Sequence, residues 1–122
     1  MIITEAPPRQ VAPESLLREP DGLRAWLQLL PANASVGVPE TLFSCPLALY
    51  LKSQGVRYPA VGPMSVRWND QNDGCRYSPE FPRYRLPDWA RRFVGLVDSR
   101  THGECVSAGQ ALELLALAEE RA

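Results

Sequence analysis

One stretch carries helix signals at both of its ends: Ser44-Cys-Pro-Leu-Ala-Leu-Tyr-Leu-Lys-Ser-Gln-Gly55. Ser44 or Cys45 is suited to the N-cap, because Pro46 has the backbone angle of a first helical turn and has no N–H to leave unpaired. Gly55 stands where a left-handed residue commonly ends a helix. Apolar residues cover most of the circumference between these ends. The sequence therefore predicts a short helix over 46–54 that is buried on more than one side.

Cys45 would lie at the positive end of this helix, where the helix dipole favours a thiolate. We expect the pKa of its thiol to lie below the usual value of about 8.5 where solvent reaches it. A thiol-dependent enzyme would also need a base, and His102 is the single histidine of the chain. The sequence contains no glycine-rich phosphate loop, no Gly-x-Ser-x-Gly and no His-Glu-x-x-His. We therefore rank a thiol enzyme that uses Cys45 third, behind two binding functions.

Apolar periodicity predicts three further helices. The first spans 21–30 with Asp21 as its cap. Its apolar stripe consists of Leu23, Trp26, Leu27 and Leu30. A second is expected over 87–98, and Ser107 with Gln110 forms a capping-box pattern at the start of the last. The inner face of this last helix is expected to hold Leu112, Leu115 and Ala116.

Alternation between apolar and polar residues predicts a small antiparallel sheet. One short strand is expected over 34–38 and another over 64–68. Residues 69–74 have the composition of a turn or loop. The return strand is either 75–78 or 84–86, so the hairpin contains a long excursion bent by prolines.

The chain has 122 residues, which is enough for one hydrophobic core. Residues 1–20 contain four prolines and are expected to form an extended arm, with at most one helical turn around 14–18. Residues 21–122 are expected to form a single α+β domain, in which about four helices pack on a small antiparallel sheet or hairpin. No run approaches the ~20 apolar residues of a membrane span, so we expect no membrane association.

The chain shows no secretory signal and has three cysteines, an odd number. We therefore expect a cytoplasmic protein with reduced thiols. Its soft metal ligands are Cys45, Cys75, His102 and Cys105. No two cysteines have the close spacing of a zinc knuckle. Residues 98–109 have the outline of a calcium loop but lack oxygen ligands at its third, fifth and twelfth positions. We expect no metal and no cofactor.

The segment 67–92 is the best candidate for binding, because it interleaves six arginines with aromatic residues against four carboxylates. Trp68 and Trp89 fit the apolar period of their elements and are expected to lie in the core. Tyr77, Phe81 and Tyr84 follow no clear period and are expected at the surface. The predicted partner-binding residues are Arg76, Tyr77, Phe81, Arg83, Tyr84 and Arg85.

Arginine and aromatic side chains serve both protein interfaces and single-stranded nucleic acid. The net charge of −1 gives no overall field to attract phosphates. We therefore expect a non-enzymatic cytosolic interaction module, a regulator or accessory subunit, that binds a protein partner through 76–85. The alternative is weak binding of single-stranded nucleic acid through the same segment. The protein itself is expected to be a monomer or a small homo-oligomer.

Overall fold

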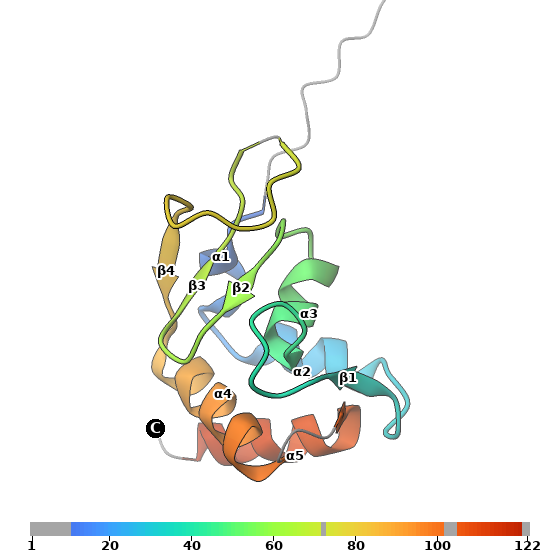
Figure 1. Ribbon diagram of the computed structural model, residues 1–122. Coiled ribbons are helices and arrows are strands. Elements are labelled where there is room, and N and C mark those ends of the chain that lie inside the picture. The colour runs from blue at the N-terminus through green and yellow to red at the C-terminus, as the bar shows by residue number, and fades with distance from the viewer. Residues whose placement is uncertain (1–10, 72, 102–104, 121–122) are drawn as a thin grey trace, which may run out of the picture.

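The computed structural model describes residues 11–71, 73–101 and 105–120. Within these ranges the predicted α+β class is confirmed, because the described helices surround a common core together with two small antiparallel sheets (Figure 1). The helices are α1 (Pro13–Leu17), α2 (Asp21–Gln28), α3 (Pro46–Ser53), α4 (Asp88–Arg100) and α5 (Ala108–Glu119). The strands are β1 (Ser35–Gly37), β2 (Ala60–Val61), β3 (Ser65–Arg67), β4 (Arg83–Arg85) and β5 (Val106–Ser107). In the described part of the chain, no helix is both long and apolar enough to span a bilayer.

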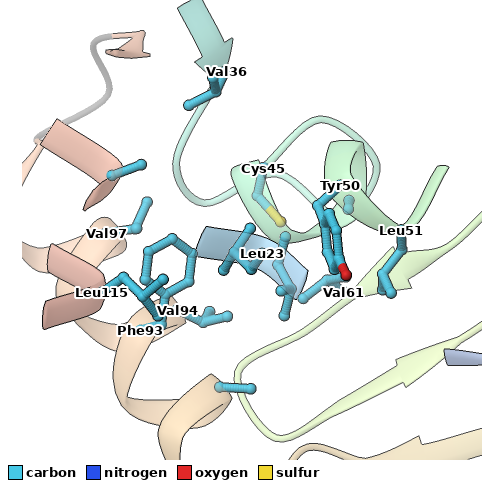
Figure 2. Close-up of a cluster of buried hydrophobic side chains, with 14 of the residues drawn as sticks. Leu23, Val36, Cys45, Tyr50, Leu51, Val61, Phe93, Val94, Val97 and Leu115 are labelled. Atoms are coloured by element: carbon cyan, nitrogen blue, oxygen red, sulfur yellow. The ribbon is translucent and has the colours of Figure 1, made fainter. Parts of the chain in front are cut away.

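Helix α3 begins and ends where its sequence signals predict. Cys45 is the N-cap, Pro46 occupies the first turn, and Gly55 has a φ of 100°. Five of its eight residues are buried, which confirms that the helix is covered on several sides: Pro46, Leu47, Ala48, Tyr50 and Leu51. Figure 2 shows Tyr50 and Leu51 of α3 in the same buried cluster as Leu23 of α2, Phe93 of α4 and Leu115 of α5.

The caps of the other helices agree only in part with the sequence patterns. The capping box of α5 is present, because the Ser107 hydroxyl accepts from the Gln110 N–H at 3.1 Å and the Gln110 side chain accepts in return at 3.0 Å. Asp21 is not the cap of α2. It lies inside the first turn and accepts a bond from Arg24 at 2.9 Å, while Pro20 takes the N-cap position.

The buried face of α5 is rotated from the predicted one. It consists of Ala108, Ala111, Leu114, Leu115 and Ala118, whereas Leu112 is half-buried and Ala116 is exposed. Helices α2 and α4 both pack against α5 (Figure 1). Small side chains let helices approach closely, so packing selects the alanine stripe over the wider leucine one.

The sheet of β2, β3 and β4 contains the predicted hairpin with its long excursion. β3 pairs with β4 in antiparallel register, Val66 opposite Tyr84, so the later of the two candidate return strands is the correct one. β2 adds two residues to the other edge of β3, which the sequence pattern did not predict. β1 does not join this sheet. It pairs with β5, Ser35 opposite Ser107.

The helical turn expected near residue 14 is α1. Its Leu17 is fully buried, and the Leu17 carbonyl accepts a 2.9 Å hydrogen bond from the indole N–H of Trp89 on α4. Trp89 is buried and Trp68 is partly buried against the core, as predicted for both. Residues 1–10 of the predicted arm lie outside the described residues, and the boundary at residue 20 stays a prediction.

Candidate functional site

The excursion between β3 and β4 is wrapped around one buried side chain. Asn69 is fully buried, and its amide N–H₂ donates to Asp73 Oδ1 at 2.8 Å and to the Cys75 carbonyl at 2.7 Å. Its Oδ1 accepts from the Gln71 N–H at 2.7 Å. The hydrogen bond from the Asn69 side chain is the largest cause that lowers the pKa of the Asp73 carboxyl below its ordinary 3.8. The loop therefore has a fixed shape that its polar composition alone did not predict.

Arg57 holds the same loop from outside. Its guanidinium donates to the carbonyl of Gln71 at 3.0 Å and to the carbonyl of Asp73. Its own carbonyl accepts from the Asn69 N–H at 2.9 Å. Because two residues of the loop bond to the Arg57 side chain and a third bonds to its backbone carbonyl, the excursion is anchored to the segment before β2 rather than extended into solvent.

The excursion also has a spacing that the sequence reasoning missed. Residues 69–80 place Asn, Gln, Asp and Glu at the first, third, fifth and twelfth positions, with glycine at the sixth, as in a calcium loop. In the structure, however, the Asp73 carboxylate and the Cys75 carbonyl both accept hydrogen bonds from the Asn69 side-chain N–H₂ group. No group of three or more His, Cys, Asp or Glu within the described ranges could hold a metal ion.

The predicted partner-binding residues do not share one surface. Arg76, Tyr77, Arg83 and Arg85 are exposed. The expectation that Phe81 lies at the surface is wrong, because the residue is only 8% exposed. Tyr84 is half-buried and packs against the core, since strand alternation turns it away from the two flanking arginines.

Tyr77 instead joins an aromatic residue from another loop. Its ring meets Phe43 edge-to-face, with the ring centroids 6.4 Å apart and the planes at 89°. Tyr77 is 49% exposed and Phe43 is 41% exposed, so neither ring is a core residue. Leu42, next to Phe43, is similarly exposed. We call these three residues the apolar patch. The sequence signal for Phe43 was an apolar pair between Pro39 and the start of α3 that fits no helix.

The exposed arginines of β4 lie at the edge of the three-stranded sheet. Neither Arg83 nor Arg85 forms an ion pair with any described residue. Arg67 stands opposite Arg83 and donates to the Pro79 carbonyl at 2.8 Å. The outer face of this edge is therefore positive and has no ionic partner among the described residues.

Cys45 does lie at a helix start, but it is buried, so the solvent access on which the expected early ionisation depended is missing. The side chain is 5% exposed, and Figure 2 shows its sulfur among apolar core residues. Loss of solvation raises its pKa from 9.0 to about 11, more than the nearby backbone of Ala48 and Leu47 lowers it. Cys45 lines a cavity of about 150 Å³ together with Asp98, whose negative charge also raises the pKa of the thiol. Burial thus outweighs the helix dipole.

The four predicted soft ligands do not share an environment. Cys45 is buried, while Cys75 and Cys105 are exposed, and all three thiols are free. His102 lies outside the described residues, so its distance from Cys45 is not given by the structure. The thiol-enzyme hypothesis requires a thiolate at Cys45, and the raised pKa of this buried thiol argues against one.

Alkaline pH should destabilise the protein through Cys45. Between pH 9.0 and about 11 the unfolded thiol loses its proton and the native thiol keeps it. The free energy of unfolding should therefore fall as pH rises, by of the order of 2 kcal/mol in total. Urea unfolding at several pH values measures this loss.

The Cys45→Ala variant is the control for this pH dependence. It should be less stable at neutral pH because it leaves a small cavity, but it should lose less stability between pH 9.0 and about 11. Tyr50, whose pKa burial also raises, contributes equally to both proteins at high pH. Parallel curves for the two proteins would show that Cys45 ionises normally.

No protein-family model matches the chain, and no curated protein or solved structure has a significant match to it.

Proposed function

We propose that this protein is a non-enzymatic interaction module that binds a protein partner through the apolar patch, with Arg76 at the rim. The observation that carries this proposal is the Phe43–Tyr77 pair, two aromatic rings from separate loops that meet outside the core. Exposed aromatic residues are the commonest anchors of protein interfaces, and arginine is often beside them. We propose the cytoplasm as its compartment, because all three cysteines are free thiols.

The stiffness of the excursion supports this proposal. Asn69 and Arg57 hold the loop that carries Tyr77, so little conformational freedom remains to be lost when a partner binds. A flexible loop of the same composition would lose part of its binding energy to ordering.

The second candidate function is weak binding of single-stranded nucleic acid. The unpaired Arg83 and Arg85 favour it, since phosphates would compensate their charge. However, bases also need exposed rings on which to stack. Phe81 is buried and Tyr84 faces the core, so only Tyr77 of the three predicted rings is available. A protein partner is therefore the better supported choice.

Substitution of either ring should weaken partner binding strongly. A photoreactive amino acid at the exposed position 76, which keeps both rings, would capture the partner in cells, and calorimetry with the purified partner would then measure affinity. We expect Tyr77→Ala and Phe43→Ala each to weaken binding roughly 30-fold, as for a central anchor. Leu29→Ala is the matched control, because Leu29 is 83% exposed at the end of α2 and lies outside the patch.

The competing function is tested with a fluorescent, mixed-sequence single strand. We expect no measurable binding at physiological salt. Micromolar affinity that falls steeply as salt rises would replace the protein-partner proposal by the nucleic-acid one, provided that this salt dependence is weaker in an Arg83→Gln, Arg85→Gln variant. If the captured partner bound the Tyr77→Ala and Phe43→Ala variants as tightly as the unaltered protein, the apolar patch would not be the binding surface.

A further inference from the structure

Helices α4 and α5 lie at the bottom of Figure 1, and the groove between them shares no lining residue with the apolar patch. It measures about 380 Å³. Its lining consists of Arg92, Gly95, Leu96 and Arg100 from α4 with Leu117 and Glu120 from the α5 end. Leu96 and Leu117 are only half-buried, so the groove has an apolar floor with charged ends.

The two helices present the same pattern of side chains with opposite charge. On α4 the order is Arg92, Gly95, Leu96 and Arg100. On α5 the order is Glu113, Ala116, Leu117 and Glu120. Each helix thus carries a small exposed residue and a half-buried leucine between two like charges. The helix α4 is positive along this face and α5 is negative.

These charges have no ionic partner among the described residues. Arg92 and Arg100 form no ion pair with any residue that the structure describes, and neither do Glu113 and Glu120. Arg92 donates through Nε to the Ala118 carbonyl at 2.7 Å, which fixes its direction along the groove. The terminal nitrogens of both arginines therefore remain available to carboxylates from outside.

Gly95 indicates that another backbone or helix approaches here. A side chain built on it would have nothing within 4 Å, and the residue is exposed in the middle of the 13-residue α4. Glycine inside a helix is destabilising relative to alanine. Packing among the described residues gives no reason for this glycine, whereas close contact with a second molecule does.

We propose that the α4–α5 face binds a second copy of this chain. A two-fold axis that runs along the helices lays α4 of one protomer on α5 of the other, so that each arginine pair meets a glutamate pair. An axis across the helices would place arginine against arginine and is disfavoured. Gly95 and Ala116 then face each other at the centre, where their small size lets the helices approach. This dimer leaves the apolar patch for a different partner.

Charge reversal tests this arrangement. One variant carries Arg92→Glu and Arg100→Glu, and the other carries Glu113→Arg and Glu120→Arg. Sedimentation velocity of the unaltered protein should show dimers that dissociate on dilution. Each variant alone should dimerise at least tenfold more weakly, because like charges then meet. An equimolar mixture of the two should dimerise again, since both contacts are restored with their signs exchanged.

The rescue in the mixture shows that both variants are folded, because unfolded chains would not associate specifically. A matched control carries Arg83→Glu and Arg85→Glu, which changes the net charge equally on β4, and it should dimerise as the unaltered protein does. Gly95→Gln should also weaken dimerisation at least tenfold while raising the thermal midpoint of the monomer. A chain that stays monomeric at millimolar concentration, or variants that do not rescue each other, would overturn the proposal.

Discussion

Gly37→Ala is expected to destabilise the protein by at least about 3 kcal/mol. Gly37 has a φ of 139°, a region that side-chain-bearing residues rarely adopt. A methyl group there would lie 2.9 Å from the Cys45 carbonyl carbon and the Pro46 nitrogen, and closer still to the Ser44 carbonyl oxygen. All three are backbone atoms at the start of α3, so relief of the clash would move the central helix. Urea unfolding followed by circular dichroism measures the loss.

Gly74→Ala is the matched control for this substitution. A methyl group at Gly74 would have nothing within 4 Å, and its backbone has no left-handed angle. Its unfolding midpoint should stay close to that of the unaltered protein. If Gly37→Ala had an equally small effect, the close approach of β1 to the start of α3 would be wrong.

The second large effect is expected for Trp89→Ala, at about 3–5 kcal/mol. Trp89 is 8% exposed and fills the space between α4 and α1. The substitution removes both this packing and the hydrogen bond to the Leu17 carbonyl. Besides the loss in unfolding free energy, limited proteolysis should then cleave the chain near α1 before it cleaves α3 or α4.

Trp89→Phe separates the two contributions. It keeps an aromatic ring but leaves the buried Leu17 carbonyl without its donor, which should cost about 1–3 kcal/mol. A Trp89→Phe protein as stable as the unaltered one would mean that the indole hydrogen bond contributes nothing and that packing accounts for the whole effect.

The helices could be predicted from the sequence because their signals are local. Pro46 and Gly55 delimit α3, and Ser107 with Gln110 starts α5, through interactions within four residues. The pairing of β1 with β5 has no such signal. It joins distant residues whose contact depends on how α2, α4 and α5 pack, and two- or three-residue strands are too short to show a period.

The binding segment could be located but its surface could not be predicted. Tyr77, Phe81 and Tyr84 look equivalent in the sequence, yet one is exposed, one is buried and one is half-buried. Their depth depends on how the excursion folds around the buried Asn69. The composition of residues 69–74 indicates only a solvated turn. Cys45 shows the same limit, because sequence reveals its place at a helix start and not its depth in the core.

The β1–β5 ribbon has a consequence for the order in which the chain folds. The N–H groups of Ala108 and Gly109 donate to the carbonyls of Ala34 and Ala32 at 2.9 Å, so the last helix is tied to a segment near the start of the chain. Closing so long a loop loses much chain entropy, and contacts of this separation slow folding. During synthesis β1 leaves the ribosome long before β5 exists. The nascent chain therefore carries an unpaired strand until β5 has been made.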